Sequence, residues 1–218
     1  MQIQWFGQSY FKIQSKNNGE DIIIATDPYN DNYGLKVQKF PADIVTISHD
    51  HEDHNNIDAI KGEPFIIKTP GEYETKGVFI HGIPAHHDNK DGQERGNIVM
   101  FKINTENISI AHLSDLGHDL NSDLLDRIGS IDILLLPVGG VYSIDAKTAS
   151  KIVSAIEPRI VIPMHYDIPG LKFKSGDKLD SVDKFLKESG LPSEKMDKLK
   201  IVKKDLPIDE TKVIILNP

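Results

Sequence analysis

The segment His49-Asp50-His51-Glu52-Asp53-His54 decides how this chain is interpreted. It follows an apolar run, Asp43-Ile44-Val45-Thr46-Ile47-Ser48, whose β-branched residues predict a buried strand. Imidazole nitrogens and carboxylate oxygens are the donors that zinc and other first-row divalent metals prefer. The segment therefore predicts a metal site of catalytic type at the end of a strand.

The same pattern recurs along the chain. Apolar runs end in a residue able to bind metal at Asp27, His49, His86-His87-Asp88, Asp115 and His165. Functional residues concentrate on loops that a rigid scaffold holds in place. We therefore expect these strand ends to converge on one site.

The spacing within the first segment allows two metals. In an extended chain His49, His51 and Asp53 would point to the same side, because side chains alternate. A turn at Glu52 would let His51 and His54 approach different ions, and two ions about 3.5–4 Å apart can share a hydroxide. The three-residue spacing of His51 and His54 differs from the four-residue spacing of a zincin helix.

Composition excludes several classes of protein. The charge of 25 basic minus 33 acidic residues, or −8, argues against general affinity for nucleic acid or anionic membranes. The chain has no cysteine, which excludes disulfides, thiolate zinc sites and cysteine nucleophiles. No apolar run is long enough to cross a bilayer, and no signal peptide is evident at Met1-Gln2-Ile3. These features favour a cytoplasmic protein.

Short strands dominate the first half of the chain, and strands alternate with helices in the second. Helices are expected at Ser122–Ile128, Asp145–Ile156 and Leu179–Ser189, the last ending at Gly190. Among the expected strands are 21–26, 44–48, 78–83, 97–103, 108–112, 131–136, 160–162, 200–202 and 212–216. This order predicts an α+β or α/β arrangement, which we interpret as a single domain over residues 1–218.

The residues match a known family. His49-Asp50-His51-Glu52-Asp53-His54 resembles the His-x-His-x-Asp-His signature of the metallo-β-lactamase superfamily. His87, Asp115 and His165 follow in the order of that family's third histidine, bridging aspartate and last histidine. Stretches such as His112–His118 and Ile162–Tyr166 are similar to the small zinc-dependent hydrolase-like group related to L-ascorbate-6-phosphate lactonase.

The resemblance implies a fold and a ligand set. The fold is an αββα sandwich, in which two mixed β-sheets are flanked by helices and the site lies at one edge. One ion would be bound by His49, His51 and His87, and the other by Asp53, His54 and His165, with Asp115 bridging both. Gln8 stands where relatives often carry histidine, and Ser114 replaces a common glycine, but neither position is a proposed ligand.

Several neighbouring residues have alternative roles. Either His86 or His87 can face the metals, and the His-Asp pair of the resemblance favours His87. Asp27 is expected to hydrogen-bond a ligand histidine, and His81 and His112 to be packed inside their strands. The remaining residues are open between a site role and a structural one: Asp88, Arg95, His118, Tyr142 and Tyr166.

We therefore predict a metal-dependent hydrolase. Two ions, zinc by default and manganese or iron as alternatives, would activate a shared hydroxide for attack on an ester, lactone or similar bond of a small molecule. Asp53 and Asp115 would position the hydroxide. The alternatives are a phosphodiesterase or nuclease, a di-iron redox protein, and a non-catalytic metal-binding protein. No nucleic-acid or membrane partner is expected, and a homo-oligomer is left open.

Overall fold

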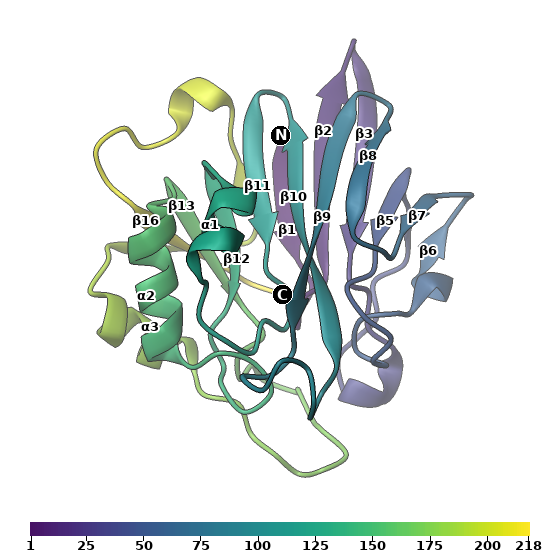
Figure 1. Ribbon diagram of the computed structural model, residues 1–218. Helices are drawn as coiled ribbons and strands as arrows, with labels where there is room; N and C mark the ends of the chain where they lie inside the picture. The colour runs from purple at the N-terminus through teal and green to yellow at the C-terminus, as the bar shows by residue number, and fades with distance from the viewer.

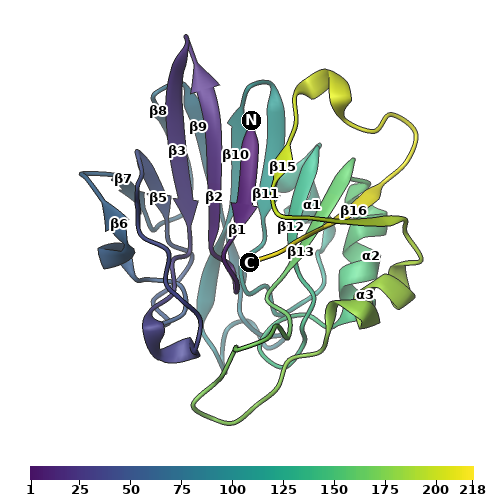
Figure 2. The ribbon, with the colours of Figure 1, turned by 180° about the vertical axis from the view of Figure 1, so that it is seen from behind.

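The fold is a sandwich of two β-sheets, described over residues 1–218 by a computed structural model (Figure 1). The first sheet has six strands and lies in front in Figure 2. In spatial order they are β15 (Leu199–Lys200), β1 (Gln2–Trp5), β2 (Phe11–Asn17), β3 (Glu20–Thr26), β5 (Ile44–Thr46) and β7 (Phe65–Ile67).

The second sheet has eight strands. In spatial order they are β14 (Ser193–Met196), β16 (Lys212–Leu216), β13 (Ile160–Met164), β12 (Ile133–Pro137), β11 (Ile108–His112), β10 (Asn97–Thr105), β9 (Val78–His86) and β8 (Gly71–Thr75). Both sheets combine parallel and antiparallel pairs. The prediction of two mixed sheets is therefore confirmed.

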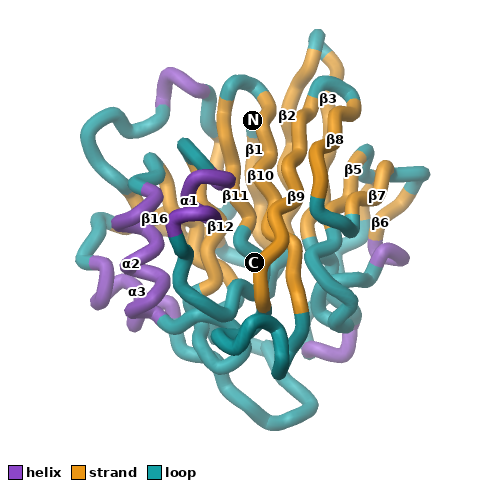
Figure 3. Tube along the Cα trace, viewed as in Figure 1, coloured by secondary structure: helices purple, strands orange, loops and turns teal.

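Three α-helices lie together on the side of β12, β13 and β16 (Figure 3). They are α1 (Ser122–Ile128), α2 (Ala146–Ile156) and α3 (Val182–Ser189). Asn121 and Asp145 cap α1 and α2, each accepting a hydrogen bond from a backbone N–H of the first turn. Gly190, at φ 63°, ends α3 in the left-handed region. All three helices were expected, although α3 begins at Val182 rather than Leu179.

The main hydrophobic core runs between the sheets and under the helices as one cluster of 50 buried residues. Alternation along the strands divides the side chains of the first sheet between its two faces. Ile44 belongs to the main core, whereas its neighbour Val45 packs into a second cluster of 8 residues with Tyr10, Tyr29 and Phe40. The small sheet of β4 (Phe40–Pro41) and β6 (Ile60–Lys61) contributes to that second cluster.

Strand direction brings the predicted strand ends together. β11, β12 and β13 run parallel, and β9 runs in the same direction because it and β11 are both antiparallel to β10. β3 and β5 are likewise parallel within the first sheet. The carboxyl ends of these strands lie at one edge of the sandwich, where their loops meet. No helix has the length and apolar character needed to span a membrane.

Candidate metal centre

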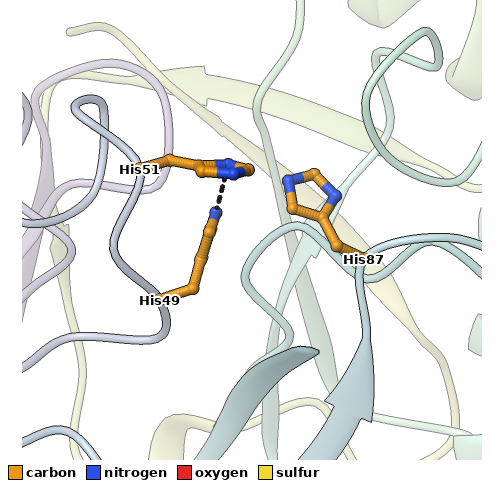
Figure 4. A group of neighbouring side chains, drawn as sticks. All are labelled: His49, His51 and His87. Carbon is orange, nitrogen blue, oxygen red and sulfur yellow. Dashed lines mark hydrogen bonds between the residues drawn. The ribbon is translucent and has the colours of Figure 1, made fainter. Parts of the chain in front are cut away.

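Three histidines from two loops form the first donor group. Figure 4 shows His49 and His51 from the loop after β5 beside His87, which follows β9. Nε2 of His49 lies 3.0 Å from Nδ1 of His51, and one nitrogen from each of the three rings falls within 4.8 Å of the others. Three imidazoles at this separation can coordinate one divalent ion.

Four buried side chains form the second donor group: Asp53, His54, Asp115 and His165. Nε2 of His54 lies 3.1 Å from Oδ2 of Asp115 and 3.6 Å from Oδ2 of Asp53. Nε2 of His165 lies 3.4 Å and 3.9 Å from the same two oxygens. The group gathers residues from three separate strand ends around a common centre.

Asp115 connects the two groups. Its Oδ2 atom lies 3.4 Å from Nε2 of His87 in the first group, as well as contacting His54 and His165 in the second. A carboxylate in this position can contribute an oxygen to each of two neighbouring ions. The structure therefore brings together all seven candidate ligands, in two groups that agree with the sets that the resemblance implies.

The segment from His49 to His54 is turned rather than extended. The backbone N–H of His54 donates to the carbonyl of His51 at 2.9 Å. Strand alternation therefore does not apply here, and Asp53 lies in a different group from His49 and His51. Of the two geometries that the spacing allowed, the structure has the turn at Glu52 and not the extended chain.

Asp27 contacts and orients one member of the second group, His54. Its carboxylate accepts hydrogen bonds from the hydroxyls of Ser48 and Ser114, at 2.6 and 2.9 Å, and from the backbone N–H of Ser48 at 2.8 Å. The same carboxylate lies 3.0 Å from Nδ1 of His54. This contact leaves Nε2 of His54 directed at Asp115, which is the orienting role expected for Asp27.

Backbone strain gathers around the centre. Gln8, Asp27, Ser114 and His165 all have positive φ, between 41° and 50°. Residues other than glycine seldom adopt this region, and they keep it at functional sites where the surrounding structure enforces it. His165 is itself a proposed ligand. Gln8 and Asp27 each lie within hydrogen-bonding distance of a proposed ligand, and Ser114 donates to Asp27.

Two glycines allow distant backbone segments to approach the backbone of two proposed ligands closely. A Cβ atom on Gly117 would lie 2.2 Å from the backbone carbon of His87, and one on Gly139 would lie 2.1 Å from the carbonyl oxygen of His165. Any side chain at either position would displace a proposed ligand. Nothing in the local sequence around Gly117 or Gly139 indicates this role, because each contact joins segments that are distant in the chain.

The charges of the centre fit a cation. Burial alone would raise the pKa of Asp53 and of Asp115, but the nearby imidazoles of His54 and His165 outweigh it and hold both pKa values below the usual range. Burial likewise acts to lower the pKa of His54, but the two carboxylates raise it well above normal. Burial lowers the pKa of His49 to about 3, so its ring is neutral, as metal ligation requires.

One atom tests the fit of a metal directly. Nε2 of His54 is buried and forms no hydrogen bond. Buried polar atoms without partners are rare in proteins and call for an explanation. A metal ion satisfies this nitrogen together with the two carboxylates, so the residues present fit a bound cation.

The neighbouring histidines lie outside both groups. Nδ1 of His86 lies 2.9 Å from the side-chain oxygen of Asn97, while buried His87 faces the centre. His118 is held by backbone groups, accepting from the N–H of His86 at 3.2 Å. His112 is buried and lies 3.0 Å from the carbonyl oxygen of Ser9. His81 lies within β9, opposite Glu72 of β8 and Lys102 of β10 in the strand register.

Gln8 is a contact that the sequence analysis missed. Its Nε2 atom lies 3.2 Å from Oδ2 of Asp53 and 3.4 Å from Nε2 of His165, and its side-chain oxygen is buried without a partner. In the sequence, Gln8 is notable only because it stands where relatives often carry histidine. The structure shows that glutamine at this position contacts two proposed ligands.

A hollow of about 520 Å³ opens above the centre. His51, Asp53, His87 and Asp115 form its floor, and its wall includes Tyr33, Arg95, Tyr142, Phe173 and Lys174. Tyr142 therefore lies at the site, whereas Tyr166 is buried and packs on Trp5 with ring centroids 4.9 Å apart. The volume is typical of pockets that bind small molecules.

Comparison with known proteins identifies the family. Residues 2–165 match the family described as the beta-lactamase superfamily domain. The chain belongs to the metallo-β-lactamase superfamily and to its metal-dependent hydrolases. The fold class predicted from the sequence is confirmed by the same comparisons.

Individual relatives agree with this assignment. A protein of Thermococcus onnurineus named UPF0173 metal-dependent hydrolase is 29% identical over 77% of this chain and 85% of its own. A structure from Thermotoga maritima, described as a Zn-dependent hydrolase of the metallo-β-lactamase superfamily, is 32% identical, covers 99% of both chains and has a TM-score of 0.77. Igni18, a metallo hydrolase from Ignicoccus hospitalis, shares the fold at 21% identity and a TM-score of 0.60, with 87% of this chain and 90% of its own covered.

Proposed function

We propose that this protein uses two divalent ions to hydrolyse an ester, lactone or similar bond of a small molecule. The observation that carries the proposal is the position of Asp115, whose Oδ2 atom lies within 3.4 Å of a histidine from each donor group. A single mononuclear site would need only one of these groups. Zinc is the default metal, and manganese or iron suits the same nitrogen and oxygen donors.

The ions, when bound, supply an activated water and polarise the bond that is broken. The protein's own part is positioning. His49, His51 and His87 hold one ion, and Asp53, His54 and His165 hold the other. Asp53 and Asp115 are the only carboxylates that belong to the two donor groups, so they are the groups that can accept hydrogen bonds from the attacking water.

The hollow favours a small substrate. Its volume of about 520 Å³ suits a molecule of metabolite size. The net charge of −8 also opposes the binding of a nucleic-acid backbone. A lactone or ester is therefore preferred to a phosphodiester of a polynucleotide.

The test combines metal analysis with a substrate screen. The purified chain should contain two ions and hydrolyse members of a lactone and aryl-ester panel faster than bis-para-nitrophenyl phosphate. A preference for the phosphodiester would replace this proposal with the phosphodiesterase alternative. Two ions without hydrolysis of any substrate would favour a metal-binding role, and a visible iron band would indicate redox chemistry.

A further inference from the structure

Arg95 differs from the other arginines of the chain. Arg127 pairs with Asp123 at 3.1 Å, and Arg159 donates to the carbonyl of Pro207 at 2.9 Å. The guanidinium of Arg95 forms no ion pair and no hydrogen bond within the protein.

The loop that carries Arg95 is held in place from within. The carboxylate of Asp88 accepts hydrogen bonds from four backbone N–H groups, those of Lys90, Gly92, Glu94 and Arg95, at 2.7–2.9 Å. Asp88 thus binds the backbone of Arg95 and not its guanidinium. The two side chains form no ion pair, and the side chain of Arg95 is left free.

Aromatic rings direct this free side chain toward the hollow. The Cζ atom of Arg95 lies 5.5 Å from the ring centre of Tyr142. Tyr142 packs on Phe173 with centroids 5.0 Å apart, and Phe173 packs on Tyr33 at 5.8 Å. Arginine stacks on aromatic faces while its N–H groups remain available to a carboxylate or phosphate.

The hollow contains no other free cation. Lys174 also lines it, but Nζ of Lys174 is bound to Glu52 at 2.9 Å. Arg95 further lines a neighbouring hollow of about 760 Å³ that includes His49, His51 and Lys68. Arg95 thus lines both hollows, and His51 of the metal centre lines both as well.

We propose that Arg95, supported by Tyr142, binds an anionic group at one end of the substrate. The hydrolysed compound would then be an ester or lactone that also carries a carboxylate or a phosphate. The inference rests on the proposed function and adds the charge of the substrate to it. Arg95 in this role determines specificity and takes no part in bond cleavage.

The experiment compares three para-nitrophenyl esters with the same chain length. The hexanoate ends in a methyl group, the adipate half-ester in a carboxylate, and the third ester in a phosphonate. The metal-loaded protein should prefer at least one charged ester. Arg95→Gln should lower kcat/KM for that ester by about ten- to hundredfold, chiefly through KM, because a hydrogen bond to a charged group is lost. It should lower kcat/KM for the hexanoate by a much smaller factor, because that ester offers no anionic group to Arg95.

Arg127→Gln is the matched control, since Arg127 is also a surface arginine but lies on α1. It should change none of the three rates. Comparison of the carboxylate and phosphonate esters identifies which oxyanion is preferred. An Arg95→Gln protein that loses equal activity on all three esters, or on none, would overturn the inference while leaving the proposed function intact.

The failure of the proposed function is recognised separately. In that case the metal-loaded wild-type protein hydrolyses none of the esters. Binding of the intact half-ester by calorimetry then tests Arg95 alone. Weaker binding to Arg95→Gln than to wild type and Arg127→Gln supports the inference, and equal binding to all three proteins overturns it.

Discussion

Gln8 lies beneath the second donor group and reaches it through its amide. Its contacts with Asp53 and His165 come from a strained residue that follows β1, far from either ligand in sequence. Groups that orient metal ligands are commonly worth a factor of ten or more in metal affinity. We therefore assign Gln8 a positioning role at this centre.

Gln8→Ala should weaken binding of one ion by about ten- to hundredfold, because Asp53 loses the amide N–H of Gln8 that donates to its Oδ2 atom. Competition with a chromophoric chelator measures both affinities. Gln2→Ala is the control, since Gln2 contacts only Gln4 through its side chain. Unchanged affinity for both ions in Gln8→Ala would show that its contacts are incidental.

Asp115→Ala should remove more metal than His51→Ala. Asp115 contacts both donor groups, whereas His51 belongs to one, so elemental analysis should show a greater loss of metal for the aspartate variant. Both variants should abolish hydrolysis. His81→Ala should retain wild-type metal content, and loss of an ion from it would contradict the ligand assignment.

The sequence could indicate which side chains gather at the candidate site, because most of them lie in one short motif or directly follow an apolar strand. It could not predict the roles of Gln8, Gly117 and Gly139. Those roles depend on contacts between segments that are distant in sequence, and a glutamine or glycine carries no local signal for such a contact.

Asp43, which directly precedes β5, connects three elements. Its carboxylate accepts from the backbone N–H of Ile23 in β3 at 2.8 Å and pairs with Lys76 in the turn between β8 and β9. Partial burial acts to raise the pKa of Asp43, but these two contacts outweigh it and lower the pKa below its usual value. The ionised form is therefore favoured by folding.

Asp43→Asn should lower the free energy of unfolding at neutral pH. A carboxyl whose pKa is lowered by folding stabilises the protein above its unfolded pKa of about 3.9, and that contribution is lost as pH falls through the folded value. The difference between variant and wild type should therefore shrink in acid. Urea unfolding at several pH values measures it, with exposed Asp58→Asn as control. A difference that grows in acid would contradict the assignment.

At the level of elements, the sequence predicted the helices better than the edge strands of the larger sheet. β8 has the sequence Gly71-Glu72-Tyr73-Glu74-Thr75 and β14 the sequence Ser193-Glu194-Lys195-Met196, both at edges of the larger sheet. Charged residues protect such edges from pairing with other chains, and they also conceal the apolar pattern of a strand. α3 begins at Val182 and not at Leu179, because the backbone of Asp180 is engaged elsewhere. Its N–H donates to the carbonyl of Gly139, and its carbonyl accepts from the N–H of Asp167.

At the scale of the whole molecule, stability depends on the contact between the two sheets. The ammonium of Lys102 in β10 reaches the carbonyl of Ile128 in α1 on the outer face. Because successive side chains of a strand point to opposite faces, Phe101 points inward toward the first sheet, and it is fully buried.

Phe101→Ala should lower the free energy of unfolding by about 3–5 kcal/mol, because it leaves a cavity between the sheets. Phe79→Ala is the control, since Phe79 lies on the next strand with 54% of its surface exposed. It should change stability by less than about 0.5 kcal/mol. Denaturant unfolding distinguishes them, and similar losses would place the main core elsewhere.

The floor and the wall of the hollow are built differently. The metal-centre residues directly follow strands. Asp27 contacts His54, and a Cβ atom on Gly117 or Gly139 would clash with the backbone of His87 or His165. Phe173 and Lys174 belong instead to an exposed connection between β13 and α3 that is fastened to the rest by a few polar contacts. Grafting that connection from a relative is therefore a route to new substrate preferences that leaves the metal-centre residues unchanged. Natural substitutions in the same connection can alter substrate preference in the same way.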